Sequence, residues 1–215
     1  MYQAIIFDLD GTLLNTIPDL ETAGNHTLTT LGAPTRTTAE FQSMVGNGIP
    51  NLVERMLPND TGNSQLYNVA LSEFLSYYEK HSDDQTRPYH GILELLTTLR
   101  ESGYELGVLT NKEDSLAQDV VQSFFPNLFT IIHGARKSMA SKPDPAGLYH
   151  ICEQLHLKTS QVLYVGDSEV DMHTAKNAQV DCCAVLWGYR TLEQLQAVGA
   201  STFIEEPSEL LSLLK

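Results

Sequence analysis

The sequence predicts an α/β protein with a mostly parallel sheet that an all-helical insert interrupts after the first strand. Three observations support this fold class. A short apolar run at residues 4–7 opens the chain as a buried strand. Residues 18–82 contain helical patterns only. From residue 88 onward strand and helix patterns alternate, which is typical of a parallel sheet. The expected domains are residues 1–15 with 88–215 as an α/β core, and residues 16–87 as the helical insert.

The helical insert consists of four segments in which apolar residues recur at helical spacing. These expected helices cover residues 18–31, 38–45, 49–57 and 64–81, and a polar linker follows at 83–88. The core continues with expected helices at 91–102, 114–125, 145–155, 169–177 and from 208. Its expected strands lie at 104–109, 129–132, 162–165, 182–186 and, with a weak pattern, 202–204.

Composition narrows the classes of function. The chain of 215 residues has 13 Lys and Arg against 27 Asp and Glu, a net charge of −14, which argues against a nucleic-acid partner. Its three cysteines form no CxxC pattern, so we expect neither a disulfide framework nor a zinc site. No apolar run approaches the length of a membrane span, and no basic leader precedes Asp8. We therefore expect a cytoplasmic protein without membrane contact, either a monomer or a homodimer.

The first strand ends in the segment Asp8-Leu9-Asp10-Gly11-Thr12, where two carboxylates stand one residue apart. Alternate positions of an extended chain share a face, so these carboxylates can begin on one side. They repel each other and are costly to bury unless a cation holds them, and hard oxygen ligands favour Mg²⁺. A strand that runs into an ordinary Asp-Gly turn would produce the same residues.

Two further expected strands also end in polar side chains. Thr110-Asn111 follows one of them, and Gly166-Asp167-Ser168 with Asp171 follows another. Lys142 lies between these segments, before a proline-stiffened turn. Ligands of open α/β sheets bind beyond the carboxyl ends of the strands, so we expect these side chains to meet there. Taken singly, they are also typical of a strand-to-loop transition, a solvated lysine and a helix cap.

Together these residues fit phosphoryl transfer. Asp8 is the candidate nucleophile that forms an aspartyl phosphate, and Asp10 is the candidate general acid and base. Asp8, Asp167 and a main-chain carbonyl at Asp10 are the candidate Mg²⁺ ligands. Thr110, Asn111 and Lys142 are expected to donate to the phosphoryl oxygens. Asp171 would order the water shell of the metal or orient Lys142.

These motifs, in this order, resemble the four motifs of the haloacid dehalogenase superfamily. The resemblance implies a Rossmann-like core and identifies the helical insert as a cap domain. Four further segments look like the phosphoglycolate phosphatase branch: Val45–Gly48, Leu109–Lys112, Lys142–Pro145 and Trp187–Tyr189. The branch implies a Mg²⁺-dependent phosphomonoesterase that acts on a small phosphorylated metabolite, with 2-phosphoglycolate as the leading substrate.

The chain also departs from the family pattern. Position 15, commonly Asp in that branch, is Asn15. Ile49 stands where the similar β-phosphoglucomutases place an Arg that grips the substrate, which disfavours a sugar-phosphate mutase. Asp10 argues against dehalogenase chemistry, which needs no second aspartate. The alternatives that stay open are a pyrophosphatase, a β-phosphoglucomutase-like mutase and, outside the enzymes, a phosphate-ligand sensor.

Weaker candidates lie in the cap and beside the site. Gly46-Asn47-Gly48 would form a loop that contacts the substrate, and Arg55 would reach a substrate carboxylate. The loop is explained equally well by a plain interhelical turn, and Arg55 is more often a solvated helix residue. Three cations, Lys112, Arg136 and Lys137, are expected to add positive potential near the site, without individual roles.

Overall fold

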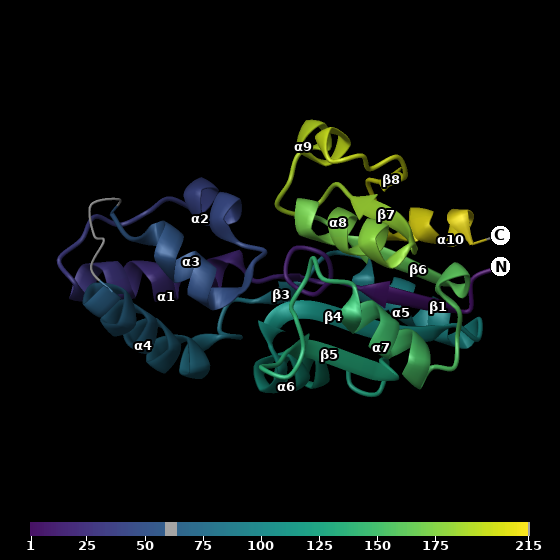
Figure 1. Ribbon diagram of the computed structural model, residues 1–215, viewed down its shortest axis with the longest axis horizontal. Helices are drawn as coiled ribbons and strands as arrows, with labels where there is room; N and C mark the ends of the chain where they lie inside the picture. The colour runs from purple at the N-terminus through teal and green to yellow at the C-terminus, as the bar shows by residue number, and fades with distance from the viewer. Residues whose placement is uncertain (59–63, 215) are drawn as a thin grey trace. The chain divides into compact units, whose positions relative to one another are not determined.

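The computed structural model describes residues 1–58 and 64–214 (Figure 1). The chain folds into two compact units. Met1–Asn15 and Pro88–Lys215 form the first, and Thr16–Arg87 forms the second. The chain thus leaves the first unit soon after its opening strand and returns to it about seventy residues later.

A six-stranded sheet organises the first unit. Its strand order is β5-β4-β1-β6-β7-β8, and its strand pairs run parallel. The opening strand lies in the interior of the sheet, between β4 and β6, which explains its continuous apolar sequence. The strands are β1 Ala4–Phe7, β4 Glu105–Glu113, β5 Ile131–Ala135, β6 Val162–Gly166, β7 Asp181–Val185 and β8 Phe203–Ile204.

Helices cover both faces of this sheet (Figure 1). Ile5 and Phe7 of β1 pack with α5 and α6, whereas Ala4 and Ile6 pack with α7 and α8. The predicted α/β fold with a mostly parallel sheet is therefore confirmed. The helices are α5 Ile92–Glu101, α6 Asp114–Phe124, α7 Ala146–Gln154, α8 Glu169–Ala178, α9 Leu192–Ala197 and α10 Leu210–Leu213, with 3₁₀ turns η1 Thr159–Gln161 and η2 Pro207–Glu209.

The second unit is helical. Its helices are α1 Ile17–Thr30, α2 Thr38–Met44, α3 Gly48–Met56 and α4 Ser64–His81. Helix α1 packs against both α2 and α4. Gly24 of α1 allows the close approach, because a Cβ there would lie 2.4 Å from the Phe41 ring. Two short strands, β2 Leu14–Asn15 and β3 Arg87–Pro88, form a separate two-stranded sheet. Among the helices that the structure describes, none has the length and apolarity to span a bilayer.

Several details differ from the sequence expectations. The short strands β2 and β3 were not expected, since residues 83–88 read as a polar linker. The strand expected at 104–109 continues to Glu113, and its pairing with β5 shifts register between Leu109 and Glu113. The strand expected at 129–132 begins only at Ile131. Helix α9 was not expected, because its six residues are too few to establish a period. Its capping box, in which Thr191 and Gln194 exchange hydrogen bonds, is the signal that could have revealed it.

Candidate active site

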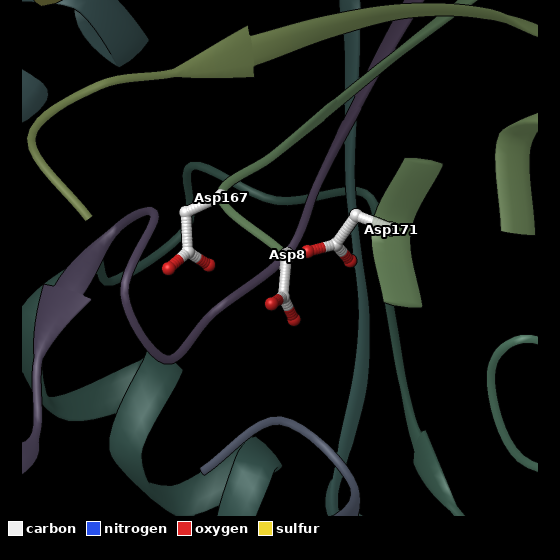
Figure 2. Close-up of side chains that lie close together, drawn as sticks. All are labelled: Asp8, Asp167 and Asp171. Carbon is white, nitrogen blue, oxygen red and sulfur yellow. The ribbon is translucent and has the colours of Figure 1, made fainter. Parts of the chain in front are cut away.

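Three carboxylates meet at the carboxyl ends of two neighbouring strands (Figure 2). Asp8 follows β1 and Asp167 follows β6. The Asp8 amide donates to the Val165 carbonyl at 2.9 Å, so the pairing of the two strands continues to the position of Asp8. Asp171 reaches the same point from the first turn of α8. Ligand oxygens of all three lie within 4.8 Å of one another, and all three residues are buried. The register of the parallel sheet therefore brings together carboxylates that are far apart in the sequence.

Lys142 is the cation at the centre of this cluster. Its Nζ lies 2.7 Å from Asp8 Oδ1, 2.7 Å from Asp171 Oδ1 and 3.0 Å from the Tyr164 hydroxyl. An ammonium group has three donors, so these contacts use its full capacity. Burial opposes the charge of Lys142, but Asp171 and Asp8 outweigh that effect and raise its pKa. The lysine is thus held as an ammonium against the candidate nucleophile.

Both carboxylate oxygens of Asp171 are engaged by protein donors. Oδ1 accepts from Lys142 and from the Tyr164 hydroxyl at 2.9 Å. Oδ2 accepts from the amide and hydroxyl of Ser168 at 3.0 and 2.6 Å, within the capping box that begins α8. These contacts favour a role for Asp171 in orienting Lys142 rather than as a metal ligand.

Asp167 is held by main-chain segments that close around it. Its Oδ2 accepts from the Tyr189 amide at 2.7 Å and its Oδ1 from the Thr12 hydroxyl at 3.3 Å. Gly11 and Gly188 are needed for this approach, because a Cβ on either would lie within 2.4 Å of an Asp167 atom. The sequence analysis did not predict the Tyr189 backbone contact, because a main-chain donor leaves no residue-type signal.

The charge of the cluster fits a divalent cation. Burial is the main cause that raises the pKa of Asp8 well above its ordinary value, and Asp171 and Asp167 add to it despite the opposing Lys142. Burial and the charge of Asp171 likewise raise the pKa of Asp167 to about 7. One ammonium therefore leaves three buried carboxylates with excess negative charge. An all-oxygen donor set with such an excess suits a hard cation such as Mg²⁺.

Asp10 takes no part in this three-carboxylate cluster. Its Oδ1 lies 3.3 Å from Nζ of Lys112, whose side chain is only 3% exposed. Gly11 has φ of +94°, so the chain turns directly after Asp10. The two carboxylates of the first motif thus each have their own lysine, a division that the sequence analysis did not foresee.

Two of the candidate phosphate donors, Thr110 and Asn111, lie in the part of β4 beyond its expected end at residue 109, and the third, Lys142, is connected to Asn111 by a hydrogen bond. The Thr110 Oγ1 accepts from the Lys112 amide at 3.1 Å, which leaves the hydroxyl hydrogen for donation. The Asn111 Nδ2 donates to the Lys142 carbonyl at 3.0 Å and so supports the backbone of that lysine. Donation from Thr110, Asn111 and Lys142 to a phosphoryl group stays a prediction.

The candidate cap residues all lie in the helical unit. Gly46 and Gly48 have φ of +124° and +79°, which favours glycine at both positions, and Asn47 precedes α3. The Arg55 Nη1 donates to the Met44 carbonyl at 2.9 Å. That bond ties α3 to the end of α2. Substrate contacts by these four residues stay predictions.

Comparison with known proteins agrees with this geometry. Residues 5–185 match the family model of haloacid dehalogenase-like hydrolases. A phosphoglycolate phosphatase of Pseudomonas syringae pv. tomato is 37% identical over 86% of this chain and 70% of its own length. One from Psychrobacter arcticus is 31% identical over 99% of this chain and 95% of its own length. The chain belongs to the haloacid dehalogenase-like hydrolases, and its similarity to these relatives confirms the phosphoglycolate phosphatase-like branch.

Solved structures show the same architecture. A protein from Lactobacillus delbrueckii subsp. bulgaricus superposes with a TM-score of 0.94 at 29% identity, covering 99% of this chain and 98% of its own. A predicted phosphoglycolate phosphatase from Haemophilus somnus gives a TM-score of 0.93 at 27% identity, covering 100% and 98%. The resemblance therefore extends over the whole chain, helical unit included.

Proposed function

We propose that this protein is a Mg²⁺-dependent phosphatase that hydrolyses a small phosphate monoester, with 2-phosphoglycolate as the leading substrate. The observation that carries the proposal is the buried Asp8 carboxylate, held 2.7 Å from Lys142 at the carboxyl end of β1. The relatives named phosphoglycolate phosphatase support the substrate. We place the enzyme in the cytoplasm, as a monomer or homodimer acting on a small phosphorylated metabolite.

The chemistry proceeds in two displacements at phosphorus. An Asp8 carboxylate oxygen forms a bond to phosphorus as the bond from phosphorus to the ester oxygen breaks, and Asp10 gives that oxygen a proton. Water then attacks the phosphorus of the aspartyl phosphate while Asp10 takes up its proton. The Asp8 carboxylate leaves with the electron pair of the broken bond, and phosphate is released.

Hydrogen-bond donors around Asp8 would stabilise the negative charge on the phosphoryl group as it is transferred. Lys142 supplies an ammonium that Asp171 and Tyr164 hold in place, and its third donor, which contacts Asp8, would turn to a phosphoryl oxygen as Asp8 bonds to phosphorus. Thr110 and Asn111 supply a hydroxyl and an amide from the same edge of the sheet. Fixed donors of this kind stabilise charge that develops in the transition state without reorganising. Asp8, Asp167 and the Asp10 carbonyl would hold Mg²⁺, which when bound offsets the repulsion between Asp8 and the phosphate.

The test is phosphate release from a panel of esters, with Mg²⁺ and with EDTA. The panel contains 2-phosphoglycolate, pyrophosphate, hexose phosphates and nucleotides. We expect Mg²⁺-dependent release that is fastest from 2-phosphoglycolate. Faster release from pyrophosphate would overturn the substrate assignment, and conversion of a hexose phosphate without release would indicate a mutase. Failure of all panel members to react would favour a phosphate-ligand sensor.

A binding measurement separates the metal from the reaction. Mg²⁺ that binds the folded state alone stabilises it by about 2.7 kcal/mol at one hundred times its dissociation constant. We therefore expect Mg²⁺ to raise the thermal unfolding temperature of the wild type. The same Mg²⁺ concentration should have little effect on Asp167→Asn, because that variant lacks one candidate ligand. An equal rise in both proteins would contradict the ligand role of Asp167.

A further inference from the structure

The two lysines at the site, Lys142 and Lys112, contact different carboxylates. The three ammonium donors of Lys142 are engaged by Asp8, Asp171 and Tyr164, all within 3.0 Å. Lys142 therefore has no donor left for Asp10. Lys112 lies against Asp10 instead, with Nζ 3.3 Å from Oδ1. A second cation thus serves the carboxylate that the proposed chemistry uses for proton transfer.

The backbone of β4 directs Lys112 to this position. The pairing of β4 with β5 shifts register between Leu109 and Glu113, and the irregular stretch contains Thr110, Asn111 and Lys112. Irregularities of this kind redirect side chains and are frequent beside active sites. The Lys112 amide also donates to the Thr110 hydroxyl at 3.1 Å, which ties the lysine to a candidate phosphate donor.

Burial makes this placement costly. A lysine has a flexible four-carbon stem and ordinarily carries its ammonium into water. Here the Lys112 side chain is 3% exposed, and that of its partner Asp10 is 16% exposed. A buried ammonium costs several kcal/mol unless it is paired and hydrogen-bonded. The pairing with Asp10 offsets that cost and fixes the direction of the Asp10 carboxylate.

Resting on the phosphatase chemistry proposed above, we infer that Lys112 is a positioning residue for proton transfer by Asp10. Its ammonium holds Asp10 Oδ1 and leaves Oδ2 to exchange the proton. In the first displacement the bond from Oδ2 to hydrogen breaks as the leaving oxygen gains the proton, and in the second the attacking water returns a proton to Oδ2. Lys112 itself neither gains nor loses a proton.

The inference is tested by leaving-group dependence. A p-nitrophenolate leaves as a stable anion, whereas an alkoxide needs a proton as its bond to phosphorus breaks. For Lys112→Met we expect kcat/KM to fall about 100-fold for the alkyl ester that wild type hydrolyses fastest, since general acid catalysis contributes at least about that factor. For p-nitrophenyl phosphate we expect less than about a fivefold fall. The ratio of the two losses reports on protonation of the leaving group, because kcat/KM includes only the steps up to and including departure of the alcohol.

A double-mutant cycle tests whether Lys112 acts through Asp10. In an Asp10→Asn background, Lys112→Met should cause no further loss of kcat/KM, because the group that it positions is already gone. Lys112→Arg should recover part of the alkyl-ester activity. Arg100→Met is the matched control, since it removes an exposed cation that pairs with Glu105 at the other end of β4. We expect that control to keep wild-type kinetics on both esters.

Other outcomes would overturn the inference. Equal losses on both esters would indicate a general effect on the site. A raised KM at unchanged kcat would make Lys112 a substrate-binding residue, and additive losses with Asp10→Asn would mean that it acts independently. If Lys112→Met does not fold, Lys112→Gln provides the same ester comparison. Failure of the proposed function itself would appear separately, as a wild type that releases no phosphate or an Asp8→Asn variant that turns over.

Discussion

Two buried aspartates, one in each unit, show how differently a carboxylate can be accommodated. In the helical unit, Asp19 accepts from the amides of Gln85 and Thr86 and from the Thr86 hydroxyl, at 2.7 to 3.1 Å. In the α/β unit, Asp8 is paired with Lys142 and faces two further carboxylates. One aspartate is surrounded by donors, and the other lies among like charges.

The difference separates a structural carboxylate from a reactive one. The Asp19 carboxylate oxygens are satisfied by hydrogen bonds, which join the segment around Thr86 to the start of α1. Burial, followed by the charges of Asp171 and Asp167, raises the pKa of Asp8, so its ionised form is strained in the folded protein. Strained carboxylates are typical of sites where a cation or substrate completes the charge balance.

The largest effect is expected for Asp8→Asn. This change removes the candidate nucleophile, so kcat should fall by at least about 10⁴-fold. Because one of three repelling carboxylates is removed, the thermal unfolding temperature in EDTA should be no lower than that of the wild type. Activity assays and thermal melts of the two proteins test both points. Asp119→Asn, at an exposed position of α6, is the control that should change neither. Turnover well above background by pure Asp8→Asn would exclude Asp8 as the nucleophile.

An intermediate effect is expected for Asp19→Ala. Removing the carboxylate leaves the buried Thr86 amide without its acceptor, whereas the Thr86 hydroxyl keeps the Ser82 carbonyl, so the free energy of unfolding should fall by about 1–3 kcal/mol. Activity per folded molecule should change little, because these contacts lie within the helical unit. Urea unfolding followed by circular dichroism measures the loss. Asp83→Ala, exposed in the same segment, should change stability by less than about 0.5 kcal/mol. Similar stability of both variants would mean that the bonds of Asp19 contribute nothing net.

The smallest effect concerns His133 of β5. Burial is the first cause that lowers its pKa, and Arg136 and His150 add to it. The folded protein therefore binds this proton less tightly than the unfolded chain. Stability is complete above the unfolded pKa of about 6.5 and is lost as pH falls below it. Between pH 7.5 and 5.5 the loss should be at most about 1 kcal/mol.

Urea unfolding of the wild type and of His133→Gln at the two pH values isolates this contribution as a difference, because the raised pKa of Asp167 acts in the opposite direction in both proteins. His133→Gln should lose correspondingly less stability on acidification, because its side chain does not titrate. His90→Gln, at an exposed position, should behave like the wild type. If His133→Gln and the wild type lose equal stability, the burial of His133 has no bearing on the acid sensitivity of the fold.

The sequence predicted the site residues that follow from strand ends, but not the contacts that depend on tertiary packing or on main-chain donors. Asp8 and Asp167 were expected near each other because parallel strands end at one edge, and β1 and β6 are indeed adjacent. Tyr164 and the Tyr189 amide were missed. Tyr164 looked like an ordinary strand residue, and its hydroxyl reaches Asp171 only because β6 faces α8. The Tyr189 contact uses a main-chain donor, which any residue type would supply.

Local sequence was sufficient for the sheet, the helical insert and the family motifs, because apolar periodicity and turn residues act over a few positions. The orientation of Lys142 by Asp171 was one of two alternatives that the sequence offered, and the tertiary structure decided which carboxylates each lysine meets. Lys142 pairs with Asp8 and Asp171, whereas Lys112, a residue without an individual role in the sequence analysis, pairs with Asp10. These partners are separated by 29 to 134 positions, and their pairing depends on register, on the irregularity in β4 and on burial. A lysine's stem reaches far enough for several partners, so only the packed structure decides which carboxylate it meets.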